Sequence, residues 1–246
     1  MIQNRSLLLV PLLSLLPLAN ASAAEAGTSL WSMIEQGGWA MIPLAICSLA
    51  LIYLAIHCLR ETRRQRFGSD AFAEALVQAC RDGQIDAALH RARQTNTMLG
   101  RTLGHALGRV DANAPETSIE SVESELADSL DVEENAIGQW IHYLSVTANV
   151  APMIGLLGTV SGMIGGFQTM ASGGMGRPEL FAGDIGEALI TTATGLCIGI
   201  PAMVAHSYFN NRLNTQMVVT TRWANTVVDA LRQATVSRME DRHSLP

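Results

Sequence analysis

The main pattern along the chain is an alternation of long uncharged segments with charged ones. The residues between Glu35 and Arg60 carry no full charge, and neither do 42 consecutive residues from Asn135 to Gly176. The segment from Ile185 to Tyr208 carries only Glu187. Because a helix needs about 20 predominantly apolar residues to cross a bilayer, we predict an all-α integral membrane protein with three transmembrane helices. Their predicted bounds are residues 39–59, 143–170 and 185–208.

The other segments are predicted to be mostly helical. In the region 60–142, SDAFAEALVQAC can be capped by Ser69 or Asp70, and Asp82-Gly83 separates it from the next helix. After Pro115, apolar residues recur at steps of mostly three, four or seven, which is one stripe of a helix. This stripe consists of Ile119, Val122, Leu126, Leu130, Ile137, Trp140 and Leu144. We therefore expect one long helix that runs without a break into the second span.

Two further segments complete this organisation. Residues 171–184 are rich in glycine and proline and are predicted to form a short periplasmic loop. Residues 209–246 are predicted to form a cytoplasmic C-terminal helix. Eight acidic residues lie between Glu116 and Glu134 with no arginine among them. They are expected to form a solvated face, and a proton-collecting surface is the alternative.

The N-terminus has the pattern of an export signal. Arg5 precedes a short apolar run, and Ala21-Ser22-Ala23 has the small-x-small pattern that signal peptidase accepts. We predict a signal peptide at 1–23 followed by a periplasmic segment at 24–38, with a retained anchor as the alternative. In either case the following residues start outside the bacterial inner membrane.

Arginine placement predicts the orientation of the spans. Four arginines lie within RETRRQR, directly after the first span, and others follow the third span. Arginine clusters next to a span remain in the cytoplasm. The N-terminus is therefore predicted to be periplasmic and the C-terminus cytoplasmic, with the region 60–142 in the cytoplasm.

Composition excludes several classes of function. Hydrophobic residues make up 48% of the 246 residues and charged residues 15%, and the net charge is −6. An acidic chain of this kind is a poor candidate for binding nucleic acid. All 16 basic residues are arginine, so there is no lysine for a nucleotide-binding P-loop or a Schiff base. The four cysteines lack metal-site spacing and are expected to be buried small hydrophobes, so no metal or cofactor is predicted.

Small residues recur at steps of four in the second and third spans. Membrane helices associate through close packing, which small residues permit. We expect these residues to form the contact of a tight antiparallel helical hairpin, and packing alone would explain the glycines. The predicted packing residues are Gly155, Gly158, Gly162, Gly166, Gly195, Gly199 and Pro201.

The polar residues in these spans are harder to explain by packing. An acidic side chain within a span usually faces a cavity, a partner or an ion path. Glu187 is near the start of its span, where a purely structural placement at the interface is the alternative. Thr191 and Thr194 follow at four and seven residues, on the same helical face as Glu187. Thr192 points about 140° away from Glu187.

Two stretches resemble segments of the MotA/TolQ/ExbB proton-channel family. APMIGLLGTVSGMIGGF at 151–167 is similar to that family's A-P-x-x-G-L-x-G-T-V segment. IGEALITTATGLCIGIPAMVAHSYFNNRL at 185–213 is similar to its E-A-L-x-x-T-A-x-G-L-x-x-x-I-P-A segment. We expect the family region to cover residues 120–220. Three spans favour the ExbB/TolQ branch, and the cleavable-looking N-terminus favours ExbB.

The resemblance implies a mechanism and partners. It implies a homopentamer in the lipid bilayer around an ExbD-like single-span protein, with a TonB-like protein delivering the work of proton flow to an outer-membrane transporter. It puts Thr159 and Thr192 on the proton path and an acidic site at Glu187, whereas the helical-face argument groups Glu187 with Thr191 and Thr194. A TolQ-like role in envelope integrity and a non-conducting membrane scaffold are the alternatives.

An intramembrane enzyme is a third class, and neither Gly-x-Ser-x-Gly nor His-Glu-x-x-His occurs to support it.

Overall fold

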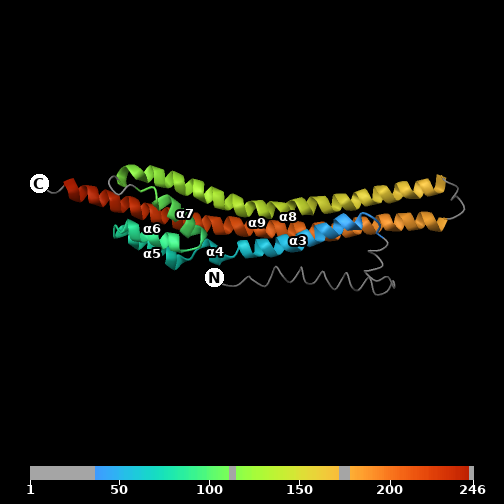
Figure 1. The fold of residues 1–246 in the computed structure, drawn as a ribbon, viewed down its shortest axis with the longest axis horizontal. Coiled ribbons are helices and arrows are strands. Elements are labelled where there is room, and N and C mark those ends of the chain that lie inside the picture. Colours follow the sequence, from blue (N-terminus) through green and yellow to red (C-terminus); the bar gives the residue numbers. More distant parts are fainter. Residues whose placement is uncertain (1–36, 111–114, 172–177, 244–246) are drawn as a thin grey trace. The chain divides into compact units, whose positions relative to one another are not determined.

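A computed structural model describes residues 37–110, 115–171 and 178–243 of the chain (Figure 1). All regular secondary structure in these ranges is α-helical, which confirms the predicted all-α class. The predicted signal peptide and most of the predicted periplasmic segment lie outside the described residues. The helices are α3 (Met41–Glu61), α4 (Arg64–Phe67), α5 (Asp70–Arg81), α6 (Ile85–Gln94), α7 (Met98–Leu107), α8 (Pro115–Ala171) and α9 (Pro178–His243).

Within the described residues, α3, α8 and α9 are long and apolar enough to cross a membrane. Large apolar side chains on these helices are exposed in the single chain, among them Leu49, Met153 and Ile200. Exposure of so many large apolar side chains marks contact with lipid or with other protein chains. The composition and the exposure together agree with three membrane spans.

The two longest helices begin at proline. Proline suits the first helical position, where its fixed φ is helical and its missing N–H needs no partner. α8 then continues for 57 residues, with Pro152 inside it, which confirms the predicted uninterrupted helix. α9 begins at Pro178, before the predicted start of the third span at Ile185, so helix occupies the second half of the predicted loop.

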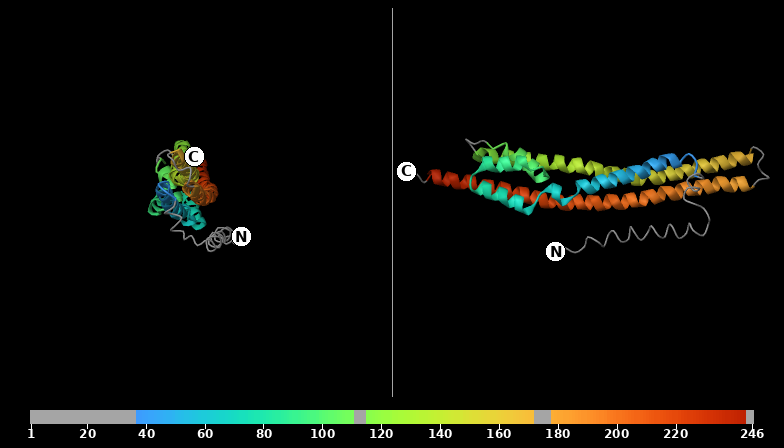
Figure 2. Two further views of the ribbon diagram at one scale, coloured as in Figure 1. Left: turned by 90° about the vertical axis from the view of Figure 1, so that its right-hand side faces the viewer. Right: turned by 60° about the horizontal axis from the view of Figure 1, so that its bottom comes forward.

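The chain divides into two compact units. The first unit contains, among the described residues, 37–49, 147–171 and 178–201. It consists of the start of α3, the later part of α8 and the first part of α9. These parts of α8 and α9 run side by side, in yellow and orange in Figures 1 and 2.

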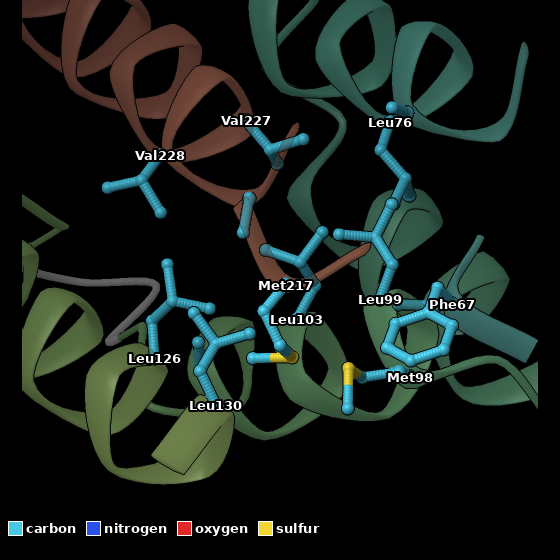
Figure 3. Packing of buried hydrophobic residues seen from close by; sticks show 14 of the residues in the cluster. Phe67, Leu76, Met98, Leu99, Leu103, Leu126, Leu130, Met217, Val227 and Val228 are labelled. Atoms are coloured by element: carbon cyan, nitrogen blue, oxygen red, sulfur yellow. The ribbon is translucent and has the colours of Figure 1, made fainter. Parts of the chain in front are cut away.

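The second unit contains α4 to α7 together with the remaining parts of α3, α8 and α9. Its buried core combines side chains from these helices, and Figure 3 shows Leu76, Leu99, Leu130 and Val228 among them. The stripe predicted along α8 contributes to this core, because Val122, Leu126 and Leu130 are buried. Burying such a side chain contributes about 1.5–3 kcal/mol to the free energy of folding. This core therefore holds the short helices against the neighbouring parts of the long ones.

Local capping explains where the short helices begin and end. The Ser69 hydroxyl accepts a hydrogen bond from the Phe72 N–H at the start of α5, which selects one of the two predicted caps. Gly83, with φ of +70°, follows α5 and supplies the left-handed residue that commonly ends a helix. At the start of α7 the Thr97 hydroxyl accepts from the Gly100 N–H at 3.2 Å.

Among the described residues, three of the acidic residues expected to form a solvated face near the start of α8 also form ion pairs at the surface. Glu133 accepts two hydrogen bonds of 2.6 Å from Arg101 on α7. Glu125 pairs with Arg109, and Glu123 pairs with Arg232 on α9. The hydrogen bonds that Arg101 donates to Glu133 raise the pKa of Arg101 above its ordinary value. Arginines distant in the sequence complete these pairs, and a local pattern does not reveal them.

The cysteines are single free thiols. Cys58 and Cys80 are buried and Cys47 is half-buried, as expected for small hydrophobes. The expectation is wrong for Cys197, which is exposed in the single chain. Cys197 lies midway between Gly195 and Gly199 in the sequence, so it points away from the face of α9 that packs on α8.

Candidate functional site

The candidate site lies on α8 and α9, which pack closely against each other. A Cβ atom added at Gly155 would lie 2.8 Å from the carbonyl oxygen of Thr191, and one at Gly195 would lie 2.7 Å from that of Ala151. Real Cβ atoms do not come so close to backbone oxygens. The two backbones therefore approach to a distance that only glycine allows at these positions.

Further small residues continue this contact in both directions. A Cβ at Gly162 would lie 3.0 Å from the Cβ of Ala188, and one at Gly199 would lie 2.5 Å from Cγ of Pro152. Partners on α9 come earlier in the sequence as positions on α8 come later, so the two helices are antiparallel. Gly166 is buried, and Pro201 is half-buried inside α9.

The threonines of the pair occupy different environments. The Thr192 hydroxyl donates to the Gly155 carbonyl on α8 at 3.1 Å. Thr191 is 1% exposed. Its hydroxyl donates to Ala188 in its own helix at 2.7 Å and, at a longer 3.4 Å, to the Gly155 carbonyl on α8. Thr194 and Thr159 also donate within their own helices, to the carbonyls of Ile190 and Leu156 at 2.8 and 2.6 Å.

This arrangement separates the two neighbouring threonines of α9. Thr191 lies against Gly158, where an added Cβ would be 2.8 Å from the Cβ of Thr191. Both hydroxyls reach the Gly155 carbonyl on α8, but Thr191 is enclosed within the chain, whereas Thr192 is half-buried. A hydroxyl that donates to a carbonyl keeps lone pairs to accept another hydrogen bond, and Thr192 and Thr159 are both accessible enough to do so.

Glu187 is half-buried near the start of α9. Its carboxylate lies against the backbone of Gly38, just before α3: a Cβ added at Gly38 would overlap Oε1 and lie 2.7 Å from Cδ of Glu187. Nearby, the Trp39 indole N–H donates to the Ser161 hydroxyl on α8 at 3.1 Å. The structure therefore brings Glu187 to a segment that precedes the first span, a contact that the sequence analysis did not predict. The only sequence signal for it is the Gly37-Gly38 pair.

The polar groups of the α8–α9 pair come without a cluster of metal-ligating side chains. No group of three or more His, Cys, Asp or Glu residues gathers in the described ranges. Carboxylate, hydroxyl and backbone carbonyl groups are the polar groups available between α8 and α9. They can accept, donate or relay protons and hydrogen bonds.

The structure is that of a membrane protein with three candidate spans, of which the second and third pack closely through glycine. Comparison with known sequences identifies the family within this general class. Residues 72–221 match the sequence model of the MotA/TolQ/ExbB proton channel family. Because this match covers more than half of the 246 residues, the chain belongs to the MotA/TolQ/ExbB proton channel family. The predicted family is therefore confirmed, and its matched region begins earlier than the expected residue 120. This is a family of transport and stator proteins and not of enzymes.

Proteins of two names within this family are similar to the chain. It is 29% identical over 150 residues to the biopolymer transport protein ExbB of Xanthomonas campestris pv. campestris, covering 61% of this chain and 53% of that protein. It is 32% identical over 108 residues to the Tol-Pal system protein TolQ of Haemophilus influenzae, covering 44% and 47%. It is 43% identical over 60 residues to the ExbB of Neisseria gonorrhoeae, covering 24% and 27%. The first two alignments span about half the length of these relatives.

Proposed function

We propose that this protein is an inner-membrane proton-channel and stator subunit that energises TonB-dependent transport across the outer membrane. In this proposal it acts with an ExbD-like single-span partner and uses the proton-motive force. The observation that carries the proposal is the half-buried Glu187 carboxylate in an otherwise uncharged part of α9. Holding an acidic side chain within a span costs about 2.5 kcal/mol or more at mid-membrane, so such residues are usually functional.

The two threonines proposed to line the proton path, Thr192 and Thr159, lie on the two different helices of the pair. Thr192 links α9 to α8 through the Gly155 carbonyl, and Thr159 is on α8 with its hydroxyl bonded to the Leu156 carbonyl. Both hydroxyls keep acceptor capacity, so they can orient water or the carboxyl group of a partner helix. Glu187 is the group among them that can itself gain and lose a proton. The buried position of Thr191 favours a packing role for that residue.

The size of the driving force limits the mechanism. Moving one elementary charge through the membrane potential releases about 2.3 kcal/mol per 100 mV. A single proton therefore drives only a small rearrangement, such as a step of partner helices inside a ring of these chains. A homopentamer in the inner membrane, with a periplasmic N-terminus and cytoplasmic C-terminus, would supply that ring. The arginine cluster after the first span supports this orientation.

The test is energised uptake in cells that depend on this protein. Glu187→Gln, Thr159→Val and Thr192→Val remove the proton-binding or hydroxyl group while nearly keeping the side-chain shape. We expect uptake to be lost in all three, with membrane level and partner co-purification intact. Uptake kept by all three would contradict the conducting role of these side chains and would favour a non-conducting scaffold.

A TolQ-like role in envelope integrity is the second candidate, because the TolQ of Haemophilus influenzae is 32% identical to the chain over 108 residues. Deletion of the gene distinguishes the two roles. Loss of energised uptake with normal detergent resistance would support the ExbB-like role. Detergent sensitivity with normal uptake would support the TolQ-like role, and the Glu187→Gln variant should reproduce whichever defect the deletion shows.

A further inference from the structure

The residues just before α3 form a small cover on the α8–α9 pair. This cover, Gly37 to Ala40, makes contacts with both helices. The Trp39 indole bonds to Ser161 on α8, and the Ala40 Cβ lies 3.1 Å from the position of a Cβ at Gly158. Gly37 and Ala40 are buried. The contacts place the cover against the side of the pair that carries Glu187.

Gly38 is the residue of the cover that meets Glu187, and both its backbone conformation and its surroundings favour glycine there. Its φ is +59°, in the left-handed region that L side chains rarely adopt. The space where its side chain would start is taken by the Glu187 carboxylate, whose Cδ and Cγ would be 2.7 and 3.6 Å from a Cβ at Gly38. Any side chain at this position would have to displace the carboxylate.

The contact restrains one side of a carboxylate that remains accessible on the other. Glu187 is half-buried, so the cover does not seal it from exchange. A side chain with several rotamers loses freedom when one side is blocked by backbone. The cover thus limits the directions in which the carboxylate can point and the directions from which a proton can reach it.

We propose that Gly38 is a positioning residue for Glu187, and that the Gly37–Ala40 cover directs its carboxylate toward the open side of the helix pair. The functional part of this inference rests on the proposed proton-handling role of Glu187. The contact itself does not depend on that role. Cross-linking and chemical labelling can therefore test the contact without a transport measurement.

The first experiment tests the contact by engineered disulfide formation. The full-length protein, with its four cysteines changed to alanine, receives Gly38→Cys together with Glu187→Cys. The matched control pairs Gly38→Cys with Gly186→Cys, because an added Cβ at Gly186 meets nothing within 4 Å. We expect rapid cross-linking under mild oxidation for 38–187 and little for 38–186. Equal cross-linking of the two pairs, or none at 38–187, would overturn the contact.

The second experiment tests positioning through the chemistry of the carboxylate. A hydrophobic carbodiimide modifies protonated carboxyl groups, and mass spectrometry of the peptide containing Glu187 gives the rate at each pH. We expect Gly38→Ala to change this rate several-fold and to shift its pH profile. Gly83→Ala is the control for strain, since Gly83 also has a positive φ, +70°, but lies between α5 and α6. An unchanged profile in Gly38→Ala would overturn the positioning role.

Measuring energised uptake by the Glu187→Gln and Gly38→Ala variants then shows whether the positioning role or the proposed function fails. If Glu187→Gln retains uptake, the proposed function fails, yet cross-linking and labelling still decide whether Gly38 positions Glu187. If Glu187→Gln abolishes uptake and Gly38→Ala alters neither labelling nor uptake, the proposed function stands and the positioning role fails.

Discussion

Arg212 on α9 donates a hydrogen bond from Nε to the carbonyl oxygen of Thr62, 2.8 Å away, at the end of α3. Its Nη1 atom donates to the Tyr208 hydroxyl at 2.9 Å, which holds the guanidinium in place. Thr62 is fully buried, so its carbonyl depends on protein donors. A cation at this position also stabilises the negative end of the α3 helix dipole.

Replacing Arg212 by leucine should destabilise the second unit. The change leaves a buried carbonyl without its charged donor, which should lower the free energy of unfolding by about 2 kcal/mol. Thermal unfolding of the detergent-solubilised protein would measure it. Arg222→Leu is the matched control, because Arg222 is exposed on the same helix. Equal stability losses in the two variants would contradict the role given to Arg212.

Close helix packing predicts opposite outcomes for two glycines of α8. Gly155→Ala places a methyl group 2.8 Å from the Thr191 carbonyl oxygen, and such overpacking costs about 1–3 kcal/mol. At Gly165 an added Cβ meets nothing within 4 Å, so Gly165→Ala should be neutral or slightly stabilising, since alanine favours helices. Thermal stability and partner co-purification distinguish them. A stable, fully assembling Gly155→Ala protein would refute the close-contact account.

Thr191 and Thr192 should respond differently to loss of the hydroxyl. Thr191→Val keeps the buried shape. It removes a 2.7 Å bond within α9 and a longer, 3.4 Å bond to the Gly155 carbonyl, which still accepts from Thr192 at 3.1 Å, so uptake should be nearly normal. Thr192→Val removes the bond to Gly155 and should abolish uptake, while Thr192→Ser should retain it. The reverse result, with protein levels unchanged, would place Thr191 on the path, as the helical-face argument from the sequence suggested.

Burial of Cys80 in the second unit predicts a loss of stability in alkali. Burial raises the pKa of this thiol from 9.0 to about 11. Below pH 9.0 the thiol is neutral in both folded and unfolded chains, and its contribution is complete. As the pH rises from 9.0 toward 11, the unfolded chain ionises first, which favours unfolding.

The measurement is the unfolding midpoint of the solubilised protein across this pH range. Part of the alkaline decrease in the wild-type protein should be missing in Cys80→Ala, which cannot ionise there. Parallel curves for the two proteins would show that Cys80 does not contribute to the decrease.

Much of the helical organisation could be predicted because it depends on local patterns. Uncharged length identified three candidate spans, and apolar spacing identified the uninterrupted α8. The steps of four from Gly158 to Gly166 and from Gly195 to Gly199 indicated where two helices could approach. The motif resemblance also predicted the family correctly, because the matching residues lie in two continuous stretches.

Contacts between distant residues could not be predicted in the same way. Helical period places Glu187 and Thr191 on one face, but it does not say which segment covers that face. The ion pair between Arg101 and Glu133 likewise joins two helices whose register depends on the whole core of the second unit.

Hydrophobic length and helical period are properties of consecutive residues, so the helical spans, the glycine faces and the family could be predicted without a structure. Tertiary packing, by contrast, encloses Thr191, leaves Thr192 half-buried, and brings Glu187 against Gly38. These outcomes could not be predicted from local patterns, because the free energy of the contacts depends on how closely two backbones approach. That distance is set jointly by all the side chains packed between them.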